Sequence, residues 1–336
     1  MRNAMPLMLA VLLVAGAMFF GGCNYTQKIS VFGKFPTPLM QTTVMGTPGA
    51  SAKIALIDVK GVISQDPSTC FGKCPPAVLP SVIARLKVIE DNPSIKAVVI
   101  RYNTPGGDAT ASDILYSEIQ SFKERSGKPV ITYMERVCAS GGVYAGVSGE
   151  TIIAHPTTVT GSIGVIFQRA DLTGLMDKIG VKLPASKSGK HKDMGSPFRP
   201  STPEEEQMFQ NIIDTMYERF VQTVATGRNL PPEEVKTFAD GRIFMAQKAL
   251  ELKLVDRLGT LKDAYETARE RAGLQKQQSR LIMWRTEETY NDTAYGPASD
   301  MYGVPGDMMT YWSSKLSAVL KPGFYYIWPA SLASGG

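Results

Sequence analysis

The chain has 336 residues, of which 43% are hydrophobic and 20% are charged, and its formal net charge is +5 at pH 7. This composition is ordinary for a globular protein, and the length allows one large domain or two small ones with an ample core. The positive charge is not concentrated in any run, and no basic stripe carries interleaved aromatic residues. These two observations argue against a nucleic-acid-binding protein.

The first 23 residues have the layout of an export signal. Arg2 precedes an apolar run from about Met5 to Phe20, and small residues lead into Cys23. The run is short for a membrane-spanning helix, which needs about 20 apolar residues. The ending FGGC resembles a bacterial lipoprotein box, in which Cys23 would be lipidated, and an uncleaved anchor is the alternative. In either case we expect an N-terminal membrane anchor, with the rest of the chain on the extracytoplasmic, periplasmic side.

The next segment, residues 24–50, lacks periodicity and is rich in Thr, Pro and Gly, which predicts a tether. In the loop that follows the first strands, Cys70 and Cys74 are close enough in sequence to bridge in an oxidising compartment, and two free thiols are the alternative. No further Cys/His pair has the spacing of metal ligands, so we expect no metal site. Cys138 is expected to be a small buried apolar residue.

Ordered structure is predicted from residue 51 onwards. Residues 53–59, 61–64, 95–102 and 129–134 are strand-like, and the last two are continuous apolar runs typical of buried parallel strands. Amphipathic helices are predicted over 77–91 and 108–127. Strand, helix, strand, helix is the signature of a βαβ array, so the sequence predicts an α/β fold.

The second half of the chain reads as shorter strands and more helices. Strands are predicted over 151–154, 158–167 and 280–286, and helices over 141–147, 170–180 and 261–273. A long helix begins at Pro203, with Thr202 as N-cap and Glu205 completing a capping box. From residue 287 the chain is rich in Tyr, Gly, Pro and Met without a period. This tail is predicted to be loosely structured; its aromatic residues could pack on a neighbour or lipid headgroups, and a poorly ordered appendage is the alternative.

Ser140 is a candidate nucleophile, because it stands between an apolar strand and a small-residue segment that can start a helix. A serine needs a base, and the chain has only two histidines, His155 and His191. A Ser-His-Asp triad built on His155 is one possibility. A lysine is the other, since burial in an apolar site lowers a lysine pKa enough for it to take a proton. Residues 187–192 supply three lysines among small residues, for which a solvated basic loop is the alternative.

Acyl transfer also needs backbone amides aimed at the developing oxyanion. The run NTPGGD over 103–108 follows a buried strand directly and offers the amides of Gly106 and Gly107. Ligands of parallel sheets gather at the carboxyl ends of the strands, where both this glycine pair and the one after Ser140 fall. Two glycine pairs after consecutive buried strands therefore favour a single site.

Four motifs in order resemble the signal peptide peptidase SppA, or protease IV, family: NTPGGD at 103–108, CASGGVYAG at 138–146, TVTGSIGV at 158–165 and KSGKHKDMGSPFR at 187–199. The similarity covers about residues 52–275, with ADGRIF at 239–244 and ALELKLVDRLG at 249–259 matching later motifs. It implies a Clp-protease or crotonase-like spiral of ββα/βαβ units with C-terminal helices. The peptidase domain would then span 51–275, and residues 276–336 would form an extension.

The resemblance also assigns roles to individual residues. It implies a Ser/Lys dyad in which Ser140 is the nucleophile, Lys192 the general base and Ser162 the residue that orients the lysine. Gly106 and Gly107 match the oxyanion donors. The residues matching the substrate-binding positions are Gly141 and the extended edge of Gly161, Ile163, Gly164 and Val165, which would pair with substrate backbone.

These observations predict a membrane-anchored extracytoplasmic serine endopeptidase that degrades signal peptides or other small extended peptides and needs no cofactor. Because short members of the family carry one catalytic unit, the resemblance implies a homo-oligomeric ring in which Ser140 meets Lys192 of a neighbour. A catalytically idle peptide-binding scaffold of the same fold is the alternative. A crotonase-like acyl-CoA enzyme is the third reading, but its cytoplasmic cofactor does not suit an exported chain.

Overall fold

The computed structural model describes residues 40–66, 77–285, 293–295 and 322–329. The predicted export signal with Cys23, most of the tether, and the loop with Cys70 and Cys74 lie outside these residues. Within the described ranges, no helix is long and apolar enough to cross a membrane. The same ranges hold no group of three or more side chains suited to ligating a metal ion.

A nine-stranded sheet forms the centre of the fold, and its main path runs β1-β11-β2-β3-β5-β6-β10. The pairs β2–β3, β3–β5 and β5–β6 are parallel, as the continuous apolar runs predicted. The path consists of β1 Met40–Gly46, β2 Ala52–Lys60, β3 Ile95–Thr104, β5 Val130–Ala139, β6 Thr151–Ala154, β10 Arg257–Leu258 and β11 Ser279–Arg285. Beside it, β7 Val159–Gly161 pairs with β5, and β9 Ile243–Met245 pairs with β7.

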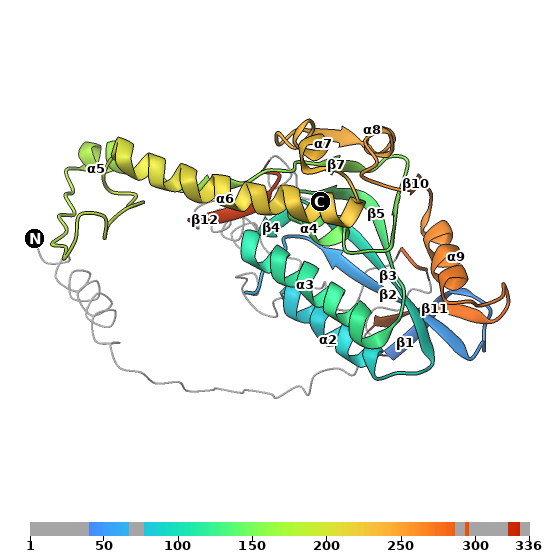
Figure 1. Cartoon of the computed structure of the whole chain (residues 1–336). Helices are drawn as coiled ribbons and strands as arrows, with labels where there is room; N and C mark the ends of the chain where they lie inside the picture. The colour runs from blue at the N-terminus through green and yellow to red at the C-terminus, as the bar shows by residue number, and fades with distance from the viewer. Residues whose placement is uncertain (1–39, 67–76, 286–292, 296–321, 330–336) are drawn as a thin grey trace, which may run out of the picture. The chain divides into compact units, whose positions relative to one another are not determined.

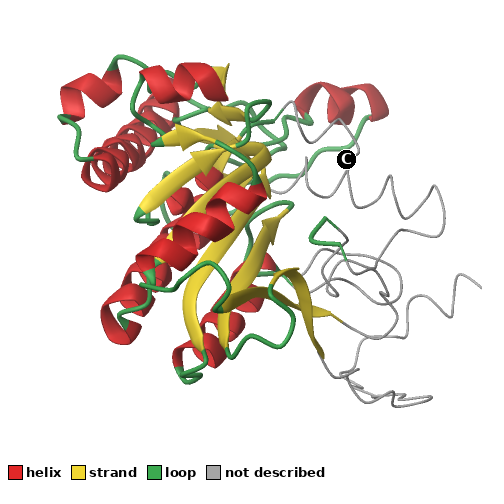
Figure 2. Ribbon diagram, turned by 90° about the vertical axis from the view of Figure 1, so that its right-hand side faces the viewer, coloured by secondary structure: helices red, strands yellow, loops and turns green. Residues whose placement is uncertain are grey.

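Helices pack on both faces of this sheet (Figure 2). One buried cluster joins the sheet to α2 Val78–Glu90, α3 Ala109–Ser126, α4 Gly141–Gly146 and the C-terminal half of α6 Pro203–Arg228. A second cluster on the opposite face joins it to α9 Leu261–Arg271. The smaller helices are α5 Thr173–Ile179, α7 Pro232–Lys236 and α8 Ala246–Glu251. The mixed α/β class expected from the βαβ pattern is therefore confirmed.

The strand β1 was not expected, because it lies in the last part of the segment predicted to be a tether. It pairs antiparallel with β11, and β11 in turn pairs parallel with β2. None of the seven residues of β1 is buried, so the strand carries no apolar alternation that a sequence pattern could reveal. The predicted strand over 280–286 is confirmed as β11, which lies inside the sheet although it belongs to the expected C-terminal extension.

A second, three-stranded sheet has the order β4-β12-β8. Its members are β4 Gly106–Asp108, β8 Ile166–Gln168 and β12 Gly323–Ile327. The strand β12 comes from the tail that was predicted to be loosely structured, and for these five residues that prediction is wrong. They pair antiparallel with β4 on one side and with β8 on the other, close to α6 (Figure 1).

The long helix α6 begins with the predicted capping box of Thr202 and Glu205. Its C-terminal half is anchored by buried side chains, including Phe220 and Val224. Its N-terminal half and α5 extend beyond the sheet (Figure 1). We call residues 169–213 the arm. The exposed apolar side chains on the arm are Leu175, Ile179, Val181, Leu183, Phe198 and Ile212.

Candidate active site

Ser140 lies at the turn between β5 and α4, with a backbone φ of 52° and ψ of −115°. A positive φ is uncommon for a residue with a side chain and costs free energy, so the fold must hold this turn in place. Part of that restraint is a hydrogen bond of 2.8 Å from the Ser140 N–H to the carbonyl of Gly161. The Ser140 side chain is buried, and its Oγ has no hydrogen-bond partner within the described part of the chain. A buried hydroxyl without a partner is unusual and marks a site poised for a ligand or a reaction.

The two glycines after Ser140 are required by close packing. A Cβ on Gly141 would lie 2.3 Å from Ser112 Oγ, and a Cβ on Gly142 would lie 2.7 Å from Thr104 Cγ2. Both distances are shorter than real carbon contacts, so a larger residue would push the turn away from β3 and α3. The two glycines therefore let the turn that carries Ser140 pack directly against β3 and α3.

The second glycine pair lies beside this turn. Gly106 has a φ of 98°, and its N–H donates to Thr104 Oγ1 at 3.1 Å, while the same Oγ1 donates to the Gly61 carbonyl at 2.6 Å. The Gly106 amide is thus engaged by Thr104, and the amide next to it in sequence is that of Gly107. The space beside the Gly141 Cα contains the Gly107 nitrogen, 3.2 Å from where a Cβ would stand.

The backbone nitrogens of Gly107 and Gly141 consequently lie close together beside the Ser140 turn. The sequence indicated Gly106 and Gly107 as oxyanion donors and gave Gly141 a substrate-binding role. Gly141 is a further candidate donor, because the residue after a nucleophile at a strand-to-helix turn presents its N–H to the same space.

Ser162 follows Gly161 and is therefore next to Ser140 across the β5–β7 pair. Its φ is 52°, its exposed fraction is 7%, and its N–H donates to the Arg242 carbonyl at 2.7 Å. Gly161 itself pairs with Ala139 on one side and with Ile243 on the other. Gly161, the first residue of the expected substrate-pairing edge, is therefore already paired on both sides within the chain. The nearby segment that pairs with a further strand is β8, which begins just after this edge.

Lys192 lies on the arm and is exposed. Because Ser140 Oγ has no partner among the described residues, Lys192 of the same chain does not contact it. Lys187 and Lys190 form ion pairs with Asp193 and Glu204, whereas Lys192 has no ion-pair partner in the part of the chain that the structure describes. A single chain therefore presents the amine without bringing it to the serine.

The two histidines do not serve Ser140 either. His155 Nδ1 lies 2.8 Å from Thr157 Oγ1, and His191 Nε2 lies 3.4 Å from Glu204 Oε1 on the arm. A triad built on either histidine within one chain is excluded, since Ser140 Oγ is bonded to neither. Cys138 is fully buried, and burial raises the pKa of its thiol, so it matches the expected inert packing residue.

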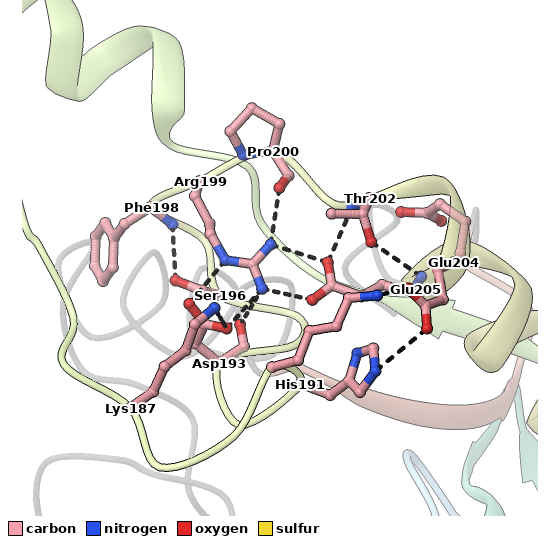
Figure 3. A network of polar contacts seen from close by, with 12 residues as sticks. Lys187, His191, Asp193, Ser196, Phe198, Arg199, Pro200, Thr202, Glu204 and Glu205 are labelled. Carbon is pink, nitrogen blue, oxygen red and sulfur yellow. Dashed lines mark hydrogen bonds and ion pairs between the residues drawn. The ribbon is translucent and has the colours of Figure 1, made fainter.

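Arg199 organises the loop that carries Lys192 (Figure 3). Its guanidinium donates to both carboxylate oxygens of Asp193 and to both of Glu205. The same Glu205 accepts the Thr202 N–H at 2.9 Å and is only 2% exposed. Hydrogen bonds from Arg199 lower the pKa of Glu205 to about 2 and hold the pKa of Asp193 well below its usual range. Asp193 is the next residue after Lys192, so this network fixes the backbone from which the amine projects.

Comparisons with known proteins point to one family. The family described as Peptidase family S49 matches residues 123–275. A protein named as a protease in Synechocystis sp. is 41% identical over 66% of this chain and 75% of its own. A protein named signal peptide peptidase SppA in Enterococcus faecium is 34% identical over 76% of this chain and 72% of its own.

Some relatives are much longer than the matched region. The chain is 32% identical to the chloroplastic serine protease SPPA of Arabidopsis thaliana over 77% of its own length, but it spans only 39% of that protein. Among solved structures, a point mutant of ClpP1 from Listeria monocytogenes has a TM-score of 0.40 and 16% identity, and the match covers 62% of this chain and 93% of that one. A likeness at this level carries no argument about function.

Proposed function

The chain belongs to peptidase family S49, among the SppA proteins, and from this premise we propose that it cleaves peptides with Ser140 as nucleophile and Lys192 as general base. Peptide hydrolysis follows from the family, whereas the dyad, the anchor and the substrates are our proposal. The observation that carries the dyad is the buried, unpartnered Ser140 Oγ at a strained turn, beside the amides of Gly107 and Gly141.

The proposed reaction has two halves. A neutral Lys192 takes the Ser140 proton while Oγ bonds to the carbonyl carbon of the scissile peptide, and the amides of Gly107 and Gly141 stabilise the oxyanion. The C–N bond then breaks, the leaving amine takes the proton from Lys192, and an ester remains on Ser140. Water gives a proton to Lys192 and its oxygen attacks the ester carbon. The bond to Ser140 Oγ then breaks, Oγ takes the proton back from Lys192, and the new carboxylic acid leaves and ionises.

We assign the base to a neighbouring copy of the chain. The serine side of the site is buried in the core, and Lys192 lies on the exposed arm, so the two do not meet within one chain. The arm also carries the exposed apolar side chains named above, and a group of this kind is characteristic of an interaction surface. A homo-oligomeric ring in which arms pack on neighbouring subunits would cover this surface and bring Lys192 to Ser140.

The proposed location follows from the N-terminus and not from the described structure. The predicted export signal would hold the peptidase at a membrane on the extracytoplasmic side, where signal peptides left in the bilayer are natural substrates. The name of the Enterococcus faecium relative, signal peptide peptidase SppA, supports such substrates.

Two single substitutions test the dyad. Ser140→Ala and Lys192→Ala should each lower kcat for an extended peptide by at least about a thousandfold, because each removes a member of a concerted pair. Lys190→Ala is the matched control, since Lys190 lies two residues away in the same loop and pairs with the exposed Glu204. Full activity of Lys192→Ala would remove the lysine from the mechanism. Full activity of Ser140→Ala would leave the chain without its proposed nucleophile.

A further inference from the structure

A chain of polar contacts begins one helical turn after Ser140. The Tyr144 N–H donates to the Ser140 carbonyl at 2.9 Å, so Tyr144 closes the first turn of α4 onto the candidate nucleophile. The Tyr144 side chain is buried, and its hydroxyl donates to Asp113 Oδ1 at 2.5 Å. Burial and this hydrogen bond raise the pKa of Tyr144 to about 12, so at neutral pH the hydroxyl keeps the proton that it donates. The side chain of Tyr144 therefore ties the nucleophile turn to Asp113.

Asp113 belongs to α3, the helix that packs against the same turn. The residue before it, Ser112, has its Oγ where a Cβ on Gly141 would clash with it, which places α3 against the start of α4. Consecutive residues of α3 thus contact both ends of the turn, Ser112 at Gly141 and Asp113 at Tyr144. The acceptor for the Tyr144 hydroxyl is a carboxylate, and hydrogen bonds to a charged group are about twice as strong as those between neutral groups.

A second helix, α6, holds the Asp113 carboxylate in place. Arg219 donates to Oδ1 from Nε at 3.0 Å and from Nη2 at 2.8 Å, and the same Nη2 donates to Oδ2 at 2.9 Å. The next residue, Phe220, makes an edge-to-face contact with the Tyr144 ring at a centroid distance of 5.0 Å. Helix α6 therefore holds the Tyr144 ring directly and holds its hydrogen-bond acceptor through Arg219.

A similar ion pair further along α3 shows what is particular to Asp113. Arg125 binds both carboxylate oxygens of Glu90 on α2, and the side chains of Arg125 and Glu90 are 52% and 24% exposed. The corresponding fractions for Arg219 and Asp113 are 62% and 28%. Exposed pairs of this kind contribute little to stability. The Asp113 pair differs because its carboxylate also accepts the hydroxyl of a buried tyrosine one turn from Ser140.

We infer that Tyr144 and Asp113 are positioning residues for Ser140, and that Arg219 keeps Asp113 in place for this role. The inference adds these residues to the active site proposed above and rests on that assignment. The hydrogen bond to Asp113 fixes the Tyr144 ring, and the ring fixes the first turn of α4. That turn sets where Ser140 Oγ lies relative to the carbonyl that it attacks, and a displacement of about 1 Å can cost about a hundredfold in rate.

Tyr144→Phe and Asp113→Asn test the inference with little change in shape. The first removes only the hydroxyl and keeps the ring, and the second removes the charge and keeps the size of the side chain. Each should lower kcat for an extended peptide about tenfold and leave KM within about twofold, because a displaced nucleophile impairs the reaction more than binding.

Glu90→Gln is the matched control, since it removes the carboxylate of the similar pair on the same helix. It should change the unfolding midpoint about as much as Asp113→Asn does and leave kcat within about twofold of that of the unchanged chain. A role of Asp113 in stability alone would affect both chains alike. Equal kcat in the Asp113→Asn and Glu90→Gln chains would therefore overturn the inference.

The double variant Tyr144→Phe/Asp113→Asn shows whether the two residues act through one contact. If Asp113 acts through the Tyr144 hydroxyl, the double variant should lose no more kcat than the more impaired single variant, about tenfold. Independent effects would multiply to about a hundredfold. A hundredfold loss would mean that Asp113 acts by another route, such as α6 and its arm, and would overturn the inference.

Hydrogen exchange supplies a measurement that does not depend on activity. The Tyr144 amide is bonded to the Ser140 carbonyl, so its exchange reports opening of the nucleophile turn. This amide should exchange at least about tenfold faster in the Asp113→Asn chain than in the Glu90→Gln chain, while the amides of β3 exchange equally in both. Equal exchange of the Tyr144 amide in the two chains would show that Asp113 does not hold the turn.

Activity and exchange separate this inference from the proposed function. If the unchanged chain hydrolyses no peptide, the proposed function fails, and the exchange comparison decides whether Asp113 holds the Ser140 turn. If the chain hydrolyses peptides but Tyr144→Phe keeps its full kcat, this inference fails and the proposed function stands.

Discussion

The N–H of Ser140 donates a hydrogen bond of 2.8 Å to the carbonyl of Gly161. This bond joins two turns that each carry a serine with a φ of 52°, because Ser162 directly follows Gly161. Both turns extend from paired strands of the central sheet, β5 and β7, so the serine half of the site is built into the core. The lysine half of the site is not in the core, because Lys192 lies on the exposed arm.

Thr104 holds in place the segment that presents the Gly107 amide, one of the two proposed oxyanion donors. Thr104→Val keeps the shape of the buried side chain but leaves the Gly106 N–H and the Gly61 carbonyl without their partner. We expect the free energy of unfolding to fall by about 1–3 kcal/mol, the usual cost of stranded buried groups. We also expect kcat to fall by up to about a hundredfold through displacement of the adjacent Gly107 amide. Denaturant unfolding and steady-state kinetics measure both effects.

The matched variant is Thr104→Ser, which keeps the hydroxyl and loses one methyl group. Its kcat should stay within a few-fold of that of the unchanged chain, although the small cavity costs some stability. If Thr104→Val retained full kcat, the hydroxyl would have no part in setting the oxyanion amides.

The serine half of the site could be predicted from the sequence because its signals are local. Continuous apolar runs predict the parallel strands, and a glycine pair after each of two such runs predicts that both turns meet at one sheet edge. The structure brings Ser140 and Gly107 together as these patterns indicate, and it places Ser162, which only the family resemblance indicated, next to Ser140. The capping box at Thr202 was equally readable, since every signal for it lies within four residues.

The parts of the fold and of the site that the sequence did not predict depend on contacts between distant segments. Nothing in the composition of residues 323–327 shows that they pair with β4, more than two hundred residues earlier, because the backbone supplies the pairing. The strand β1 has no buried residue, so its pairing with β11 leaves no mark on the sequence. The position of Lys192 relative to Ser140 could not be predicted from the residue pattern, and only the family resemblance implied that the two meet between neighbouring chains.

Arg199 should act as a positioning residue for Lys192. Arg199→Lys removes the planar fork that binds Asp193 and Glu205 at the same time, and a lysine ammonium does not replace it. We expect kcat to fall by about tenfold or more with little change in KM, since a displaced base impairs the reaction more than binding. Lys248→Ala is the control, because Lys248 forms an exposed ion pair with Glu251 on α8, outside the site. A change confined to KM would contradict the positioning role.

Acid should loosen the same network. The pKa of Glu205 is about 2 in the folded chain, and Asp193 is shifted in the same direction, because Arg199 favours both charged forms. A depressed carboxyl pKa stabilises the fold above the unfolded-state value, which is about 4 for these residues, and that stabilisation is lost as the pH falls towards the folded value. The unfolding midpoint of the Ser140→Ala chain should therefore be steady from pH 7 to about 5 and fall between about pH 4 and 2.

Glu205→Gln separates this network from the other carboxylates of the chain. The variant lacks the titrating group, so its unfolding midpoint should be lower at neutral pH and should decline less steeply between about pH 4 and 2. Chemical unfolding at a series of pH values measures both slopes. Parallel curves for the two chains would show that Glu205 contributes nothing to the acid sensitivity.

Subunit mixing decides whether the dyad is shared. Chains with Ser140→Ala still present Lys192, and chains with Lys192→Ala still present Ser140, so each preparation alone should be inactive. If the base comes from a neighbour, an equal mixture assembled from unfolded or co-expressed chains contains some sites with both functional residues. Random assembly through one repeated, head-to-tail interface makes about a quarter of all sites complete, so about a quarter of the unchanged activity should return.

In the control mixture, the double variant Ser140→Ala/Lys192→Ala takes the place of the Ser140→Ala chain, and the Lys192→Ala chain is kept. No site in that mixture can hold both residues, because every intact Ser140 then faces a chain that lacks Lys192. Activity in the first mixture and none in the second requires a site built from two chains. If the first mixture also stayed inactive although mixed assemblies formed, Lys192 would have to reach Ser140 within its own chain. The arm would then need to fold back onto the core, away from the position in which the structure leaves Lys192 exposed.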